Sequence, residues 1–388
     1  MSGKRGFERG FSLIELMLAL TIGLLLSGFM VAIIVNTSAS NREIDKSNRQ
    51  IENGRYASEL LRDDMRLAGF YGDYGGVLPA AGALATVCSS TAADLLAGLL
   101  MPIQSFTAAA TNALSTACSG SLVTGSESPQ VVVGTDVIIV RRTDTNAVCG
   151  TGTTPAVPTV GDYYLQSTAA GALDVQVGTN AAGGFAFGTT KADGTATDLC
   201  KKVLTPAVVT AGGRDNSCPT VLTSSTVAIP ANATGSCVGF TAAAIRKLHV
   251  NIYYISPCNI CSGTADSIPT LKRLRLIAGG FNVEPLVDGI ENLHIQLGVD
   301  TSDPTDVVNY GSPDSYLDAP LTQAQWANVV TVRLHVLSRN TDSTPGYTDP
   351  KTYVLGSRSV TPGGAYKRHA FSSLIRLENL AARREIPS

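Results

Sequence analysis

The chain has 388 residues, enough for one large domain or two ordinary ones. Charged residues make up 15% of the chain, well below the roughly 25% of an average soluble protein. The formal net charge of −2 excludes the strongly basic balance typical of nucleic-acid-binding proteins, so we expect no direct nucleic-acid partner. Alanine, threonine, serine and glycine are abundant in place of charged residues. This composition suits a β-rich extracytoplasmic domain.

The N-terminus joins a short basic stretch to a long apolar one. Residues 1–10 carry three basic side chains and one acidic one, and residues 16–35 carry no charge. Extended backwards through residues 11–14, the apolar stretch is long enough to cross a bilayer core of about 30 Å as a helix. The basic leader should stay in the cytoplasm, so we expect the rest of the chain beyond the membrane.

Two ordinary interpretations of this stretch leave something unexplained. A secretory signal peptide has a shorter apolar core that ends at an A-x-A-like site, and no such site follows here. A plain membrane anchor fits the length but gives no reason for Glu15, the carboxylate within the apolar segment. A charge at mid-membrane costs roughly 2.5–3.5 kcal/mol, so Glu15 needs a partner even near the end of the segment.

Gly10-Phe11-Ser12-Leu13-Ile14-Glu15 resembles the class III signal of type IV prepilins. The resemblance implies that a prepilin peptidase cuts between Gly10 and Phe11 and methylates the new N-terminal Phe11. Glu15 then becomes the fifth residue of the mature chain. In that family this carboxylate pairs with the N-terminal amine of a neighbouring pilin, and a buried anion is tolerated when a cation meets it.

The helix is predicted to continue well beyond the membrane, because the first proline is Pro79. Residues 36–41 are polar and mark the exit from the bilayer. An apolar stripe at helical spacing then predicts a face that packs against a β-sheet. The stripe consists of Ile44, Ile51, Ala57, Leu60, Leu61, Met65 and Ala68.

This helix should run from residue 11 to about residue 67, which is roughly 85 Å at 1.5 Å per residue. Asn53-Gly54 is its predicted weak point, where it could bend. Turn chemistry at residues 69–72 (GFYG) should end it.

After residue 72 the sequence predicts strands and loops. The expected fold is α+β and type IV pilin-like: a long, partly transmembrane N-terminal helix packed on an antiparallel β-sheet with long disulfide-pinned loops. In residues 330–336 valine and leucine alternate with polar side chains, so Val330 and Val332 should face the core. The predicted strands are residues 135–143, 249–255, 271–277, 293–299, 329–337 and 371–377.

Residues 80–130 and 144–240 have few charges and weak periodicity, so we expect long loops with short strands. All eight cysteines follow the apolar segment, and their even number indicates disulfides in an oxidising compartment rather than free buried thiols. Cys258–Cys261 is the first expected pair and Cys88–Cys118 the next. Two further pairs should form among Cys149, Cys200, Cys218 and Cys237, with their connectivity left open.

Several groups of residues have chemical potential, but none favours catalysis, a metal or a cofactor. His249, His294, His335 and His369 are expected as isolated surface residues; the alternative is a metal cluster if the strands of the first three are neighbours. Cys258-x-x-Cys261 is expected as a local disulfide, with a redox dithiol or a zinc site as alternatives. The acidic run Asp300, Asp303 and Asp306 is expected as a solvated turn rather than a calcium loop. No GxSxG, Walker A or GxGxxG motif occurs.

A second resemblance covers parts of the outer helix and much of the C-terminal third of the chain. Residues 286–293 (LVDGIENL) with 298–300 (GVD), residues 55–57 and 66–70, and the segments 326–337 and 366–377 are similar to PilW-type minor pilins. The resemblance implies a structural subunit, not an enzyme, that primes or joins a type IV pilus, near its tip, and supports motility, adhesion or DNA uptake indirectly.

The implied partners are the prepilin peptidase, other minor pilins, the major pilin and inner-membrane lipid, with a pilus-tip adhesin as a further candidate. The expected location is the inner membrane, with a single span and a periplasmic C-terminal domain, and then the pilus. The expected parts are a leader (1–10), a transmembrane half-helix (11–35), an amphipathic half-helix (36–69) and a β-rich domain (70–388). A minor pseudopilin of type II secretion is one alternative, and an anchored periplasmic binding or redox module is another.

Overall fold

The computed structural model describes residues 12–72, 74, 78, 86–148, 159–167, 173–178, 245–303, 305 and 309–385. The chain divides into two units, with the boundary inside the first helix: Met1–Arg49 and Gln50–Ser388. The second unit, which we call the globular unit, contains every strand of the described part of the chain. Its strands pair antiparallel, so the expected α+β fold is confirmed.

Helix α1 (Leu13–Arg66) is 54 residues long and continues without interruption through Asn53-Gly54. No proline breaks its hydrogen-bond ladder, and the good helix formers leucine, alanine, arginine and glutamate recur along it. It ends before Gly69, whose φ of 72° is a left-handed conformation that favours glycine. The glycine-containing turn predicted at residues 69–72 therefore ends the helix.

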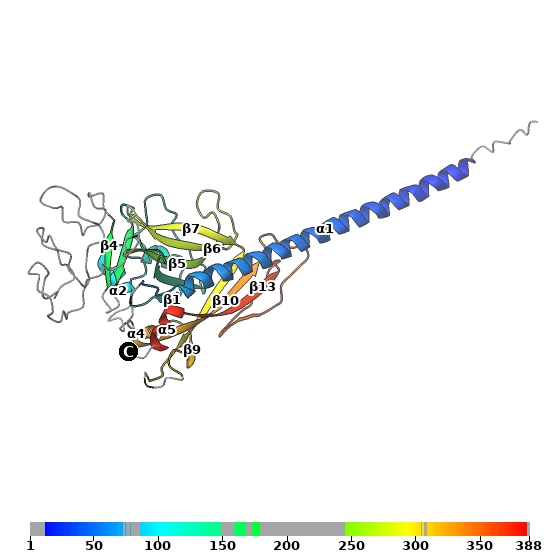
Figure 1. Cartoon of the computed structure of the whole chain (residues 1–388). Coiled ribbons are helices and arrows are strands. Elements are labelled where there is room, and N and C mark those ends of the chain that lie inside the picture. Colours follow the sequence, from blue (N-terminus) through cyan, green and yellow to red (C-terminus); the bar gives the residue numbers. More distant parts are fainter. Residues whose placement is uncertain are drawn as a thin grey trace, which may run out of the picture. The chain divides into compact units, whose positions relative to one another are not determined.

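The larger sheet has seven strands, and β5 lies at its centre, pairing with β2, β3 and β6 (Figure 1). Beyond these, β1 pairs with β2, β4 with β3 and β7 with β6. The strands are β1 (Ile103–Thr107), β2 (Asp136–Thr143), β3 (Tyr163–Ser167), β4 (Leu173–Val177), β5 (Ile245–Ser256), β6 (Thr270–Ile277) and β7 (Gly280–Asp288).

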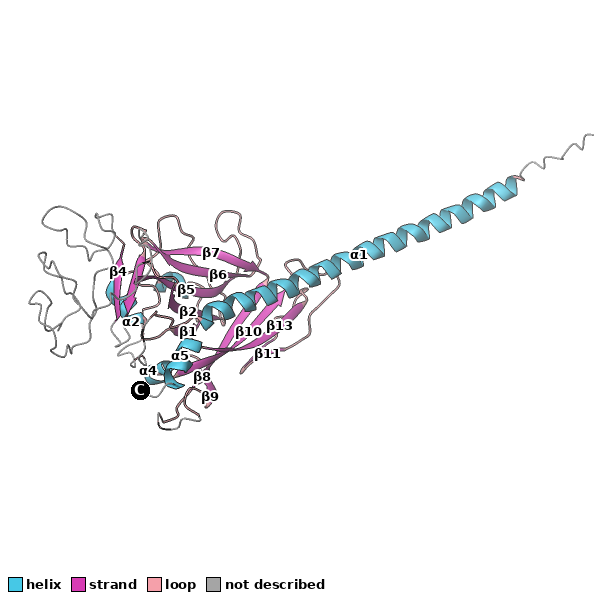
Figure 2. Ribbon diagram, in the orientation of Figure 1, coloured by secondary structure: helices cyan, strands magenta, loops and turns pink. Residues whose placement is uncertain are grey.

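The smaller sheet has four strands in the order β13-β10-β8-β9, and a separate hairpin is formed by β11 and β12 (Figure 2). These strands are β8 (Ile290–Val299), β9 (Ser315–Leu317), β10 (Val329–Arg339), β11 (Tyr353–Leu355), β12 (Arg358–Val360) and β13 (Arg368–Arg376). Four short helices complete the described elements: α2 (Ala92–Gly98), α3 (Ala113–Ala117), α4 (Gln323–Ala327) and α5 (Glu378–Glu385).

The seven-stranded sheet is buried on both faces, as alternation along β2 shows. Ile138 and Val140 join a core that includes the C-terminal part of α1 and the inner face of the smaller sheet. Val137 and Ile139 point the other way, into a second core under α2 and the Cys88–Cys118 disulfide. The C-terminal part of α1 thus packs against strands of both sheets, which places it between them.

All six strands predicted from the sequence are present, as β2, β5, β6, β8, β10 and β13. At the start of the predicted face, both Val329 and Val330 are fully buried. A register irregularity lies between Val329 and Thr331, and Val329 belongs to the same core cluster as Val332. Residues 80–130 also contain two short helices, α2 and α3, where loops with short strands were expected.

Candidate assembly segment

The N-terminal part of α1 exposes apolar side chains on every side. An 18-residue window of this helix has a mean hydropathy of 2.6, and none of the window is buried. This is the described helix that is long and apolar enough to cross a membrane, by length and composition. A helix that is apolar all round needs a bilayer or other apolar helices to cover it. Its exposed large side chains are Leu13, Ile14, Leu16, Met17, Leu18, Leu20, Ile22, Leu24, Leu25, Leu26, Phe29, Met30, Val31, Ile33, Ile34 and Val35.

Glu15 lies in the first turn of this helix and caps it. Its carboxylate Oε2 accepts a hydrogen bond from the backbone N–H of Ser12 at 3.0 Å, while Ser12 Oγ accepts one from the N–H of Ile14 at 3.2 Å. This reciprocal arrangement satisfies two of the backbone donors that a helix start leaves unpaired. Gly10 and Phe11, where cleavage and methylation are predicted, lie outside the described residues.

The outer part of α1 is fixed to the sheets by amide side chains. Gln50 donates from Nε2 to the carbonyl of Ser338 in β10 at 3.0 Å, and Asn53 donates from Nδ2 to the carbonyl of Asp288 in β7 at 3.0 Å. Both carbonyls lie at strand ends. These bonds set the position of the helix along the strands, which apolar contacts alone would leave free to slide.

Gly54 of α1 lies directly against the ring of Phe371 in β13. A Cβ placed on Gly54 would lie 2.1 Å from Cε2 of Phe371, a ring that packs partly buried against the core. Any side chain at this position therefore requires Phe371 to move. Glycine is needed here for space, although it is unfavourable inside a helix by about 1 kcal/mol relative to alanine.

We expect Gly54→Ala to destabilise the globular unit by about 1–2 kcal/mol, because overpacking against Phe371 outweighs the gain in helix propensity. Thermal unfolding of the detergent-solubilised chain checks this. The matched control is Gly28→Ala, since nothing lies within 4 Å of a Cβ at Gly28. That variant should leave the melting temperature of the globular unit unchanged. A stabilised Gly54→Ala variant would contradict the close contact.

Asp64 is a buried carboxylate on the face of α1 that meets the larger sheet. Its oxygens accept hydrogen bonds from Arg142 Nε at 2.6 Å, Asn251 Nδ2 at 2.8 Å and the hydroxyl of Tyr253 at 2.8 Å. Burial, reinforced by the Asp64 carboxylate, raises the pKa of Tyr253 far above its ordinary value, so the tyrosine stays a hydrogen-bond donor. The cluster joins α1 to β2 and β5.

Helix α5 closes the C-terminal end of α1. Asn379 Nδ2 donates to the carbonyls of Arg66 and Ala68 at 3.4 and 3.3 Å, and Arg383 donates to the carbonyl of Gly69 at 2.7 Å. These donors satisfy carbonyls that the helix end leaves unpaired, and the Arg383 cation complements the negative end of the helix dipole.

The opposite face of the outer helix is exposed. Tyr56 is 54% exposed and Ile51 40%, so two large side chains that a core would bury lie in solvent. Ile51 was predicted on the buried stripe, and that is wrong, because Gln50 occupies the stripe position instead. Ile44 from the same predicted stripe is also exposed. This exposed face, which also carries Arg55, Glu59, Arg62 and Arg66, is available for contacts with other molecules.

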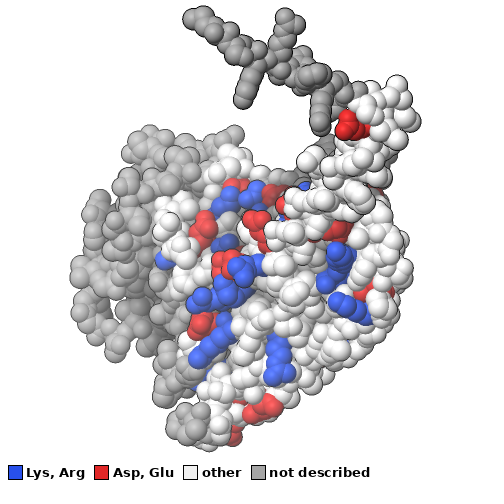
Figure 3. Space-filling model, turned by 90° about the vertical axis from the view of Figure 1, so that its right-hand side faces the viewer, with Lys and Arg blue, Asp and Glu red and all other residues white. Residues whose placement is uncertain are grey.

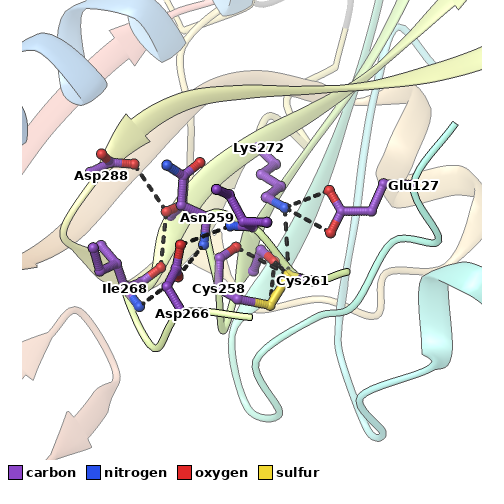
Figure 4. The surroundings of a disulfide bond; sticks show 11 residues. Glu127, Cys258, Asn259, Cys261, Asp266, Ile268, Lys272 and Asp288 are labelled. Atoms are coloured by element: carbon purple, nitrogen blue, oxygen red, sulfur yellow. Dashed lines mark hydrogen bonds and ion pairs between the residues drawn. A yellow bond between two sulfur atoms is a disulfide. The ribbon is translucent and has the colours of Figure 1, made fainter. Parts of the chain in front are cut away.

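Two disulfides are described, and they pair the cysteines that the sequence analysis expects first. Cys88 is bonded to Cys118, with both residues buried in the second core, and Cys258 to Cys261 at the start of the loop between β5 and β6. Cys149, Cys200, Cys218 and Cys237 lie outside the described residues. The loop of Cys258 and Cys261 is shown in Figure 4, where Asp266 points at its backbone.

Removing Cys88–Cys118 by paired Cys→Ala substitution should cost more stability than removing Cys258–Cys261 in the same way. The first pair is separated by 30 residues and the second by 3, so chain-entropy arguments give about 3.5 against about 2 kcal/mol. Chemical denaturation of the two double variants under identical conditions measures the difference. Equal losses would contradict the prediction.

The expectation of isolated surface histidines is wrong for two of them. His294 and His335 lie opposite each other on β8 and β10, with ring centroids 6.1 Å apart, and His294 is only 1% exposed. Adjacent strands bring them together, and the β11–β12 hairpin covers them through Ser357, whose Oγ lies 3.2 Å from His294 Nε2. Burial, with His294 and Arg333 adding to it, lowers the pKa of His335.

His294 links β8 to β2 and to the β11–β12 hairpin. Its Nδ1 lies 2.7 Å from Asp136 Oδ2, and Arg358 from the hairpin reaches the other oxygen of Asp136 at 3.2 Å. Burial opposes ionisation of Asp136, but the hydrogen bonds from His294 and the Ile295 N–H hold its pKa below the ordinary value. His249 pairs separately with a carboxylate 2.7 Å away on Asp144. Within the described residues, no three His, Cys, Asp or Glu side chains are grouped to hold a metal.

The expected solvated acidic turn is wrong at Asp300, which is fully buried. Its carboxylate accepts from the N–H groups of Ser302 and Gly311 at 2.9 and 2.7 Å and from Arg384 of α5 at 3.0 Å. Burial opposes ionisation, but these donors hold the pKa of Asp300 below its ordinary value. Asp303 caps its own turn through Thr305, and Asp306 lies outside the described residues.

The surface charge is mixed. On the face shown in Figure 3, acidic and basic side chains lie interspersed over the globular unit. Within the described residues many charges are paired, as in Arg273 and Arg275 with Glu284. This face offers no field of a single sign, in agreement with the net charge of −2.

Two segments of the chain match known protein families. Residues 252–379 match the family described as type IV pilus-assembly protein W, and residues 2–31 match the prokaryotic N-terminal methylation motif. The first match spans the segment from within β5 to the start of α5, and the second contains Gly10, Phe11 and Glu15. No curated protein and no solved structure matches the chain.

Proposed function

We propose that this chain is a minor subunit that primes or joins the pilus near its tip. The proposal starts from its match to PilW-type prepilins, which are pilins of the type IV pilus group. The role is structural. Motility, adhesion and DNA uptake then depend on the fibre that the subunit helps to build, and the subunit itself carries out no reaction.

The observation that carries the proposal is the all-round apolar exposure of α1 before the globular unit. The window of mean hydropathy 2.6 has no buried residue, so the described part of the chain leaves this segment exposed. A bilayer covers it before assembly. In a fibre, the same segments of other subunits would cover it, which needs no change of fold.

The proposed parts follow from this. Residues 1–10 are a leader that the prepilin peptidase removes, residues 11–35 are the transmembrane half of the helix, residues 36–69 are its outer half, and residues 70–388 are the globular domain. We propose that Phe11 becomes the methylated N-terminus and that Glu15 then meets the amine of a neighbouring subunit. The Ser12 bond holds the carboxylate at the start of the helix until then.

The proposed orientation puts the leader in the cytoplasm and the domain in the periplasm, because the basic residues precede the span. The expected contacts are the prepilin peptidase, the inner-membrane lipid, other minor pilins and the major pilin, with a tip adhesin as a further candidate. Family membership supports contact with other pilins and with the peptidase.

Quantitative mass spectrometry of sheared pili tests the minor-subunit role. We expect this chain in the pilus fraction at a small fraction of the amount of the major pilin, and fewer surface fibres when its gene is deleted. A chain found only in membranes, with normal fibre number after deletion, would contradict the proposal. A chain as abundant as the major pilin would contradict the minor role.

A further inference from the structure

The disulfide between Cys258 and Cys261 lies beside a buried cation. Lys272 on β6 is 1% exposed, and its Nζ lies 3.5 Å from Cys261 Sγ. On its other side the same ammonium contacts Glu127 at 2.9 and 3.2 Å (Figure 4). Ser256 Oγ lies 3.2 Å from Cys261 Sγ as well. Cys261 Sγ thus lies near two hydrogen-bond donors, and the carbonyl oxygen of Cys258 lies 3.2 Å from it as well.

The loop that carries the disulfide is held by other bonds too. The carboxylate of Asp266 accepts from the N–H groups of Asn259, Ile260 and Ile268 at 2.8, 2.9 and 3.0 Å. The cysteines are only 3 residues apart, so their bond closes a very short loop and constrains the unfolded chain little. The sulfur–sulfur bond can therefore open while the loop keeps its Asp266 contacts.

We propose that Cys258–Cys261 is a thiol–disulfide exchange site whose reduced form is stabilised by pairing of a Cys261 thiolate with the Lys272 ammonium. A dithiol reductant supplies two electrons and two protons. The sulfur–sulfur bond breaks, Cys258 ends as a thiol, Cys261 ends as a thiolate, the reductant ends as its disulfide, and one proton goes to solvent. The partner class is a dithiol oxidoreductase of the oxidising compartment in which these disulfides form.

The geometry assigns the charge to Cys261 rather than to Cys258. Ser256 Oγ is 3.2 Å from Cys261 Sγ but 3.9 Å from Cys258 Sγ, and the Lys272 contact is to Cys261. A nearby ammonium stabilises a thiolate, and a stabilised reduced form makes a disulfide a stronger oxidant. Glu127 competes for the same ammonium, so it weakens this effect. Removing Glu127 should act in the opposite direction to removing Lys272.

The test is an equilibrium redox titration of the full chain in detergent, with mixtures of reduced and oxidised dithiothreitol. Free thiols are alkylated and the peptides of the four described cysteines are read by mass spectrometry. Lys272→Gln should make Cys258–Cys261 about tenfold harder to reduce, the effect of losing one hydrogen bond to a charged group. Glu127→Gln should make it easier to reduce. Cys88–Cys118 is the internal standard and should titrate alike in all three proteins.

A measurement on the wild type keeps the test independent of how the variants fold. In the reduced protein at about pH 7, iodoacetamide should modify Cys261 faster than Cys258, because the thiolate is the nucleophile. Equal rates would overturn the proposal. The proposal would also be overturned if Lys272→Gln and Glu127→Gln left the Cys258–Cys261 equilibrium unchanged. It would be overturned as well if both variants shifted that equilibrium in the same direction, because general loosening of the loop predicts the same direction for both.

Discussion

Replacing Asp64 with alanine should lower the free energy of unfolding of the globular unit by about 3 kcal/mol. The carboxylate is 7% exposed and bonds to an arginine, an asparagine and a tyrosine. Without it, Arg142 loses its counter-ion, and the amide of Asn251 and the hydroxyl of Tyr253 keep their burial but lose their acceptor. Denaturant unfolding of the detergent-solubilised chain measures the loss.

The adjacent residue supplies the control. Asp63 is 74% exposed, and its nearest cation is Arg62 at 3.9 Å. Asp63→Ala should change stability by less than about 0.5 kcal/mol, because exposed ion pairs contribute little. The two variants delete the same group one position apart on α1. A similar effect at both positions would show that Asp64 does not anchor the helix.

Glu15→Val should leave membrane insertion and cleavage after Gly10 intact but reduce incorporation into pili at least about tenfold. A lone carboxylate is a cost to the subunit in the bilayer, so its removal does not hinder insertion. In the assembled fibre the mutation would leave the amine of a neighbouring subunit buried without a counter-ion, which costs several kcal/mol. Membrane level, processing and the amount in sheared pili are compared with wild type in a strain lacking the native gene.

Glu15→Gln separates the two roles of this side chain. The amide oxygen can still accept the Ser12 N–H bond at the helix start, but it carries no charge. If pairing with an amine matters, glutamine should fail like valine. If capping of the helix is the whole role, glutamine should behave like wild type, and normal incorporation of either variant would count against an assembly contact.

The sequence predicted the elements better than their contacts. Runs of β-branched residues, such as those of β2 and β10, predict strands because their periodicity is local. The buried face of α1 was only partly predicted, since Gln50, Gly54 and Asp64 lie on it and are not apolar. The available signal was their spacing: Gly54 lies three residues before Ala57, Asp64 three residues after Leu61, and Gln50 four residues before Gly54, which puts all three on the same helix face.

Long-range pairings were the least predictable part. Nothing near His294 in the sequence shows that Asp136, 158 residues away, is its partner, and nothing near Asp300 points to Arg384. Such polar contacts depend on which strands become neighbours, and that is decided by the packing of the two cores. The N-terminal features are local, because a leader, a cleavage junction and an apolar helix are read from consecutive residues. Of these, the apolar helix is confirmed as the first part of α1, and the leader and the junction stay predictions.

The intact mass of the chain recovered from the pilus fraction tests the central claim most directly. A type IV pilin of this kind should start at Phe11 and carry one methyl group on that amine, whereas the same chain from a strain without the prepilin peptidase should start at Met1 or Ser2 and stay in the membrane. A mature chain that begins at any other residue, or an uncut chain in the pili of the wild type, would contradict the account.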